Sequence, residues 1–248
     1  IVNKVVSVYK PIGMTPGELV KSYKEDNPEY ANEVISYAGR LDPLAHGVMV
    51  LLIGDANKKR REYERSDKVY EFKAILGFST DSYDICGLIK ETGNTTPVDV
   101  ETISSELKRF EGKQKQDFPI FSSYKIKGKA LFAWARENKL NEIEIPSKEI
   151  EVYETTVLNT ESVIGADLLQ DIESRISLLK GNFRQEEIVG KWRATIKQAS
   201  VYQVVNMKAK VSAGTYIRGI VNDLGGKLGT KATVLEIYRP QSGEYTIK

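Results

Sequence analysis

The sequence predicts a mixed α/β (α+β) fold, and two observations support this class. Segments whose apolar residues alternate, as in half-buried strands, are interleaved with segments whose apolar residues recur every three or four positions, as in helices. No internal repeat, low-complexity tract or Pro/Gly-rich linker divides the chain. With 248 residues, 41% of them hydrophobic, the chain is long enough to bury a full core. We therefore expect one main domain over residues 1–248, with one or two appendages.

The N-terminal segment predicts a strand followed by a capped helix. Residues 5–9 have the pattern of a short strand, and residues 10–14 form a tight loop that contains a proline and a glycine. Thr15 occupies an N-cap position, Pro16 the first helical position, and Glu18 the third position after the cap. This is the signature of a capping box, so we expect a helix to begin at Pro16.

The middle of the chain predicts one further strand and three helices. Residues 67–78 alternate in polarity, and the apolar face of this strand carries Tyr70, which is therefore expected to point inward. Apolar stripes at helical spacing occur in three segments, 99–110, 129–138 and 166–180. We expect each of these segments to be an amphipathic helix.

The C-terminal part predicts a strand that runs directly into a helix. Residues 205–211 alternate, and the Gly-Thr-Tyr sequence at 214–216 separates them from apolar positions at helical spacing that begin with Ile217. This junction places Arg218 in the first turn of the helix, beside the point where the strand ends.

Composition excludes several classes of function. One cysteine, Cys86, rules out an internal disulfide framework, and one histidine, His46, leaves too few ligands for an ordinary zinc site. Any chemistry must therefore use carboxylates, phenols and cations. The longest apolar runs, such as 48–53, are far shorter than the roughly 20 residues that cross a bilayer, and residues 1–9 lack the plan of a signal peptide. We expect a cytoplasmic protein without a metal or a membrane segment.

Charge is distributed unevenly, although the net charge is only +2. Residues 108–129 contain seven basic side chains and two acidic ones, whereas residues 141–173 contain nine acidic side chains and one basic one. Such blocks can place a positive face on a nearly neutral protein, which suits a polyanion. Ordinary solvated faces explain the same pattern equally well on composition alone.

Asp42 stands in the most informative stretch of the chain. It lies between Leu41 and Pro43, within the sequence Gly-Arg-Leu-Asp-Pro-Leu-Ala at 39–45. By itself this pattern favours a turn aspartate, because the proline keeps the preceding residue extended. Its neighbours change that interpretation. Motifs follow one another in fixed order at 10–15, 39–58, 68–77, 80–87, 116–136 and 214–229.

Together these motifs resemble those of the TruB family of tRNA pseudouridine synthases, over about three quarters of the chain. The resemblance implies the pseudouridine synthase fold, with a mainly antiparallel central sheet flanked by helices, and no cofactor. It identifies Asp42 as the nucleophile that attacks a uridine. Arg218 is expected to orient Asp42 through a two-pronged contact, and Tyr70 to stack on the target base or transfer a proton.

The resemblance also implies how RNA is bound. Residues 108–136 correspond to a basic segment that grips RNA, and a stacked base must be flipped out before it can react, which is easiest in an unpaired loop. We therefore expect a monomer that acts on tRNA, at the T-loop uridine of position 55. The predicted substrate-binding residues are Lys10, Tyr37, Tyr216, Ile237, Lys125, Lys127 and Lys129.

Several features depart from the family pattern. Tyr37 stands where the family usually has a histidine. The Gly-Arg-Leu-Asp sequence at 39–42 is also found in ribosomal-RNA pseudouridine synthases. Residues 163–193 are expected to be an inserted helical segment, and the family's C-terminal PUA domain is expected to be absent. Two alternatives therefore stay open, a synthase that acts on ribosomal or another structured RNA, and a non-catalytic RNA-binding module on the same scaffold.

Overall fold

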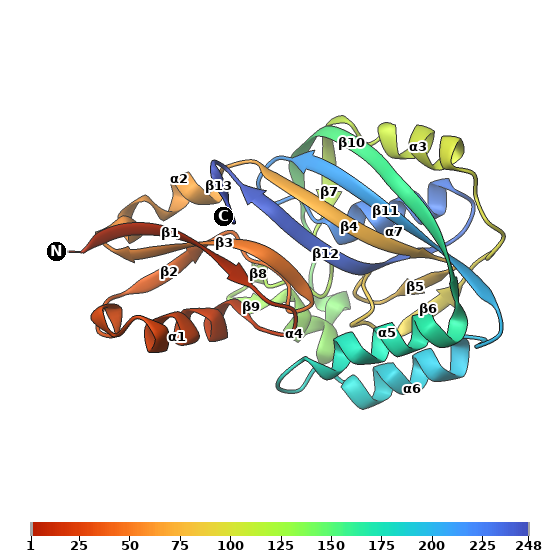
Figure 1. The fold of residues 1–248 in the computed structure, drawn as a ribbon, viewed down its shortest axis with the longest axis horizontal. Helices are drawn as coiled ribbons and strands as arrows, with labels where there is room; N and C mark the ends of the chain where they lie inside the picture. Colours follow the sequence, from red (N-terminus) through yellow and green to blue (C-terminus); the bar gives the residue numbers. More distant parts are fainter. Residues whose placement is uncertain (1, 248) are drawn as a thin grey trace.

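A nine-stranded sheet runs through the molecule in the computed structural model, which describes residues 2–247 (Figure 1). The main strand order is β1-β3-β12-β4-β11-β10-β7, with β2 paired to β3 and β13 paired to β12. Every pairing in this sheet is antiparallel except that of β12 with β3, so the expected mainly antiparallel sheet is confirmed. The strands are β1 (Asn3–Lys10), β2 (Ile35–Ala38), β3 (Ala45–Gly54), β4 (Lys68–Leu76), β7 (Gly112–Asp117), β10 (Ser147–Ile164), β11 (Val201–Val211), β12 (Ala232–Ser242) and β13 (Tyr245–Thr246).

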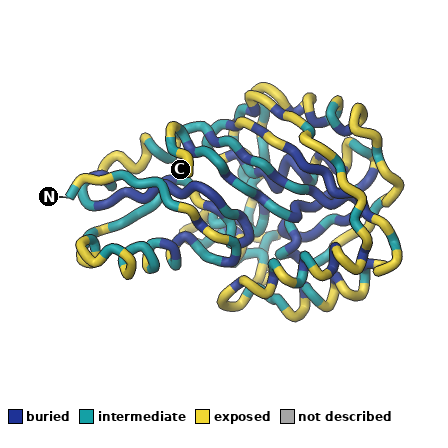
Figure 2. The backbone as a smooth tube through the Cα atoms, viewed as in Figure 1, coloured by how far each residue is buried: buried dark blue, intermediate teal, exposed yellow. Residues whose placement is uncertain are grey.

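Helices cover both faces of this sheet. Alternation along β4 sends Phe72 and Ala74 into one core cluster, with residues of α3 (Val100–Lys108) and α7 (Ile217–Lys227), and Ile75 into another, with residues of α5 (Gly165–Ser177) and α6 (Gln185–Thr195). Figure 1 shows α5 and α6 packed together as a hairpin, and Figure 2 shows that the buried backbone runs along the central strands. The remaining helices are α1 (Pro16–Asp26), α2 (Arg60–Glu64) and α4 (Leu131–Arg136), with 3-10 turns at Pro28–Tyr30, Asp55–Lys59 and Leu140–Glu142.

The predicted elements are present, with two corrected boundaries. The capping box is formed, because Thr15 accepts a hydrogen bond from the Glu18 amide and donates its own amide to the Glu18 carboxylate. The strand expected over 67–78 breaks at Gly77, whose φ of +97° ends β4 and begins the small hairpin of β5 (Phe78–Thr80) and β6 (Ile89–Thr92). The helix expected over 129–138 begins only at Leu131, since β8 (Lys125–Ile126) and β9 (Lys129–Ala130) form a hairpin before it.

The parallel contact between β12 and β3 positions the loop that carries Asp42. Ile237 pairs with Ala45, and Arg239 pairs with Gly47. A Cβ atom on Gly47 would lie 2.3 Å from the Arg239 carbonyl oxygen, so only glycine permits this close approach. Residues from the end of the sequence thereby lie beside the segment 39–44.

Two further expectations concern the chain as a whole. The segment 163–193 is largely helical, as expected, because it contains α5 and most of α6. Its status as an insertion stays a prediction. Among the described residues, no helix is both long enough and apolar enough to span a membrane.

Candidate active site

Asp42 lies on a loop between β2 and β3, and Lys10 holds this loop in place. The Lys10 ammonium is fully buried and donates to the carbonyl oxygens of Pro11, Met14 and Pro43 at 2.9, 2.6 and 3.2 Å. Burial lowers the pKa of Lys10 to about 8. The Asp42 side chain is 39% exposed and faces a cavity. Lys10 therefore braces the loop and does not line the cavity.

Arg218 reaches Asp42 from the first turn of α7, as the strand-to-helix junction predicts. Its Nε donates to Asp42 Oδ2 at 2.7 Å, while its Nη1 and Nη2 donate to the carbonyl oxygens of Ser82 and Phe121 at 2.6 and 3.2 Å. The expected two-pronged contact is therefore wrong, because the guanidinium divides its donors among three acceptors. Only one Asp42 oxygen is engaged, and Oδ1 has no hydrogen-bond partner among the described residues.

Asp84 is a second carboxylate at this centre, and it was not among the predicted site residues. Its Oδ2 lies 3.7 Å from Arg218 Nε, and its Oδ1 accepts from the Ser82 hydroxyl at 2.5 Å and the Cys86 amide at 3.0 Å. Burial raises the pKa of Asp84 to about 6 despite the neighbouring guanidinium. The motif at 80–87 contained this residue, but nothing local indicated that it meets Arg218.

A cavity of about 240 Å³ opens beside Asp42 and Arg218. Tyr70, on β4, points into it from the apolar strand face, and Tyr216 and Ile237 line it as well. Tyr70 and Ile237 are buried and Tyr216 is half-buried, and burial raises the pKa of the Tyr216 hydroxyl. We call this space the base cavity. The structure thus brings four other predicted site residues together around the Asp42 carboxylate, namely Tyr70, Tyr216, Arg218 and Ile237.

Arg239 supports the base cavity and was missed by sequence reasoning. It is 1% exposed, and its guanidinium donates to the carbonyl oxygens of Val48, Gly39 and Arg40 at 2.9, 2.9 and 3.2 Å. Its Nη1 also lies 3.4 Å from the Tyr70 hydroxyl. Arg239 therefore connects the loop before Asp42 to β12, the strand on which Arg239 lies. An arginine before a proline in a strand gives no such signal in sequence.

The other predicted substrate-binding residues lie away from the base cavity. Tyr37 lies on β2, packs against the core and has the Arg60 guanidinium 5.6 Å from its ring centre. Lys125 and Lys127 are exposed on the hairpin of β8 and β9. Lys129 is half-buried, forms an ion pair with Glu137 and lies over the Trp134 ring at 4.5 Å. Tyr37 and Lys129 thus have structural partners already.

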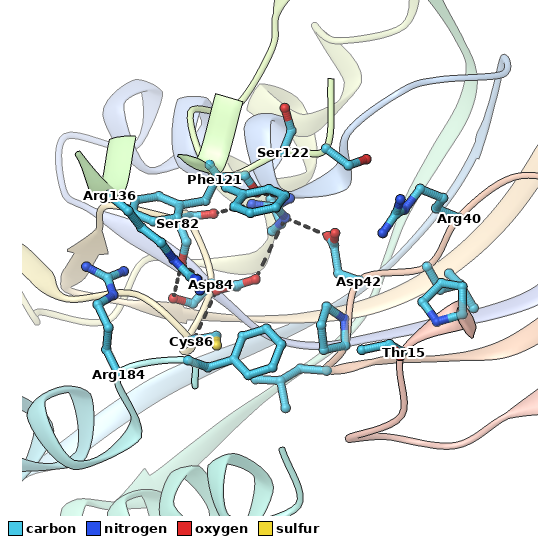
Figure 3. A pocket seen from close by; sticks show the side chains of 18 of the residues that line it. Thr15, Arg40, Asp42, Ser82, Asp84, Cys86, Phe121, Ser122, Arg136 and Arg184 are labelled. Carbon is cyan, nitrogen blue, oxygen red and sulfur yellow. Dashed lines mark hydrogen bonds and ion pairs between the residues drawn. The ribbon is translucent and has the colours of Figure 1, made fainter. Parts of the chain in front are cut away.

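A second, larger cavity of about 360 Å³ is also lined by Asp42 (Figure 3). Arg40 and Arg218 line both cavities, whereas Phe121, Phe132 and Arg184 line only this one. We call it the flanking cavity. Within residues 2–247, no group of three or more His, Cys, Asp or Glu side chains is arranged to hold a metal ion.

Comparison with known proteins identifies the family of this chain. A model described as the TruB family pseudouridylate synthase, N-terminal domain, matches residues 29–183. The chain therefore belongs to the TruB family of pseudouridine synthases. Among similar proteins, those called tRNA pseudouridine synthase B from Fusobacterium nucleatum and Lactobacillus acidophilus are 30% and 31% identical to it. These matches cover 98% and 100% of this chain, and 69% and 71% of the relatives.

Solved structures support the fold independently. The structure titled "Crystal Structure of a Cbf5-Nop10-Gar1 Complex" matches 98% of this chain with a TM-score of 0.60 and 20% identity. This chain spans 50% of the matched one. At this identity the likeness concerns the fold alone.

Proposed function

We propose that this chain isomerises a uridine to pseudouridine in the T-loop of tRNA. One observation carries the proposal. The Asp42 carboxylate is held by Arg218 at 2.7 Å, at the mouth of a cavity lined by Tyr70 and Ile237. A non-catalytic binding module needs neither this ion pair nor the buried guanidinium. The relatives named tRNA pseudouridine synthase B support tRNA as the substrate.

The reaction exchanges one glycosidic bond for another. Asp42 acts as the nucleophile, with Oδ2 fixed by Arg218 and Oδ1 free to form a transient bond to the uridine, which breaks again before pseudouridine leaves. The bond between uracil N1 and the ribose then breaks, and a bond between uracil C5 and the same ribose carbon forms. A proton leaves C5 and one is gained at N1, so nothing is transferred overall. Tyr70 and Ile237 hold the detached base, and Tyr70 is our candidate for the proton transfer.

The base cavity requires a flipped nucleotide. A base stacked in a duplex cannot reach Asp42, and flipping costs a few kcal/mol, least where the base is unpaired. A T-loop meets that condition. That the protein acts as a monomer, as expected from the sequence, stays a prediction. The cytoplasmic location expected from sequence stays a prediction.

Tritium release tests the substrate assignment. A tRNA transcript carrying 5-tritiated uridine is incubated with the protein, because pseudouridine formation releases the C5 hydrogen. A matched transcript has cytidine at the T-loop target, and a ribosomal-RNA transcript represents the alternative class. We expect one equivalent of tritium to be released from the first transcript. The second transcript should release one equivalent less, because its target uridine is replaced. Release from the ribosomal transcript alone would assign the chain to that class.

A further inference from the structure

The flanking cavity adjoins the base cavity at Asp42, which lines both of them. Besides Asp42, both cavities are lined by Arg40 and Arg218. A nucleotide whose base enters the base cavity therefore has its neighbour in the RNA chain within reach of the flanking cavity. The flanking cavity contains none of Tyr70, Tyr216 and Ile237, so it is chemically distinct from the site of the target base.

The walls of the flanking cavity are rich in aromatic rings. Phe121, Phe132 and Phe183 all line it, and they come from three separate segments of the chain. Phe132 is 38% exposed, and the Arg136 guanidinium lies 5.6 Å from the centre of its ring. Exposed rings in a cavity of this kind are the surfaces on which unpaired bases stack, whatever their sequence.

The charges of the flanking cavity suit a phosphate. Arg184 is paired with Asp81 at 3.0 Å, and Arg218 with Asp42. Arg40 and Arg136 are exposed and, among residues 2–247, neither has a carboxylate within 4.0 Å. Figure 3 shows Arg136 and Arg40 on opposite sides of Asp42. Unpaired guanidinium groups favour phosphate oxygens because they offer parallel donors without a competing carboxylate.

The loop between α5 and α6 closes the flanking cavity. Asn182, Phe183 and Arg184 of this loop line it, and Arg136 Nη2 donates to the Asn182 carbonyl oxygen at 3.2 Å. The Arg184 guanidinium lies 4.7 Å from the centre of the Phe121 ring, so the loop also contacts the wall opposite. The helical segment 163–193 thus extends to the catalytic centre and is more than a cover for the sheet.

We propose that the flanking cavity binds the nucleotide next to the target uridine, with its base against Phe132 and its phosphate near Arg136. This inference rests on the proposed function, because it assumes that the target base occupies the base cavity. It assigns the loop between α5 and α6 the role of a second nucleotide-binding wall.

A binding cycle between protein and RNA tests the assignment. T-arm stem-loops that already carry pseudouridine at the target are made intact, or with an abasic nucleotide on the 5′ or the 3′ side. Their Kd values are measured with the unaltered protein and with Phe132→Ala. We expect one abasic RNA to bind the unaltered protein about tenfold more weakly, within the roughly 5- to 150-fold that base–aromatic stacking supplies. Phe132→Ala should weaken binding of the intact RNA by a similar factor. It should weaken binding of that abasic RNA by less than about twofold more, because the stacking contact is already lost.

Tyr153→Ala is the matched control. Tyr153 is 42% exposed on β10 and lines neither cavity, so its replacement should leave every Kd within about twofold. Equal weakening of all three RNAs by Phe132→Ala, or unchanged binding of both abasic RNAs, would overturn the assignment. Tritium release from the unmodified stem-loop separates the two proposals. If the stem-loop is turned over but Phe132→Ala and the abasic RNAs show no coupling in Kd, only the role of the flanking cavity is refuted. If there is no turnover, the tRNA function is refuted together with it.

Discussion

Replacing Arg218 with lysine should abolish most activity, although the positive charge is kept. The guanidinium donates to three acceptors in different directions, namely Asp42 Oδ2 and the carbonyl oxygens of Ser82 and Phe121. A lysine ammonium is a single point of charge and cannot occupy the positions of three guanidinium nitrogens. We expect the substituted side chain to retain at most the contact with Asp42, which leaves two carbonyl oxygens without a donor.

The geometry sets the size of the effect. Each hydrogen bond to a charged group contributes roughly 1.5–3 kcal/mol, so two lost bonds cost about 3–6 kcal/mol of interaction. If half of this cost appears as a misplaced Asp42 in the transition state, the barrier rises by about 1.5–3 kcal/mol. That corresponds to a loss of about 10- to 150-fold in kcat/KM. We expect a loss near the upper end, since Arg218 is only 3% exposed and solvent cannot replace the bonds.

Tritium release under single-turnover conditions measures this loss, and thermal unfolding checks that the variant is folded. Arg193→Lys provides the matched control. Arg193 binds Glu173 through two nitrogens at 2.6 and 3.0 Å, but it is 62% exposed and lies on α6. Its replacement should change turnover by less than about twofold. If Arg218→Lys stays within threefold of the unaltered enzyme, the division of donors does not position Asp42 and the reasoning is refuted.

Three further outcomes follow from the same contacts. Asp42→Asn should fold and bind RNA normally but show no turnover, and residual activity within tenfold would remove Asp42 as the nucleophile. Asp84→Asn should change the dependence of stability on pH, as measured by urea unfolding. The pKa of Asp84 is raised to about 6, so its carboxyl in the folded protein stays protonated between pH 4 and 6, where the carboxyl of the unfolded chain ionises. The contribution of Asp84 to the free energy of unfolding therefore falls as pH rises through this window. The Asn variant should lack that fall, and an identical pH profile would contradict the raised pKa. Replacing Lys125 and Lys127 with serine should flatten the slope of log affinity against log salt by about 1.4, and an unchanged slope would show that neither contacts phosphate.

Local patterns were sufficient to predict the elements that carry the centre. The capping box at Thr15, the alternation that turns Tyr70 inward and the junction that puts Arg218 in the first helical turn are each set by neighbours in sequence. Such signals depend on backbone periodicity and on short-range hydrogen bonds, which a single segment contains in full. The mixed α/β class followed from them, whereas the pseudouridine synthase fold and the roles of the site residues were implied by the resemblance of the motifs.

Contacts between distant segments could not be predicted in this way. Asp84 becomes a site residue only because α7 brings Arg218 to it, and Arg239 only because β12 pairs in parallel with β3. The two-pronged contact expected for Arg218 failed for the same reason, since Ser82 and Phe121 compete for its donors. Tyr37 has the right residue type for stacking, yet its strand register turns it toward the core.

The position of β12 has a consequence for synthesis. This strand lies in the middle of the sheet between β3 and β4, yet the ribosome makes it after every other strand but β13. Until it emerges, a nascent chain has an unpaired edge along β4, and the segment before Asp42 lacks Arg239 to hold it. We expect such a chain to be inactive on RNA and open to wrong strand pairing, which makes this interval of translation the one in which a chaperone is most useful.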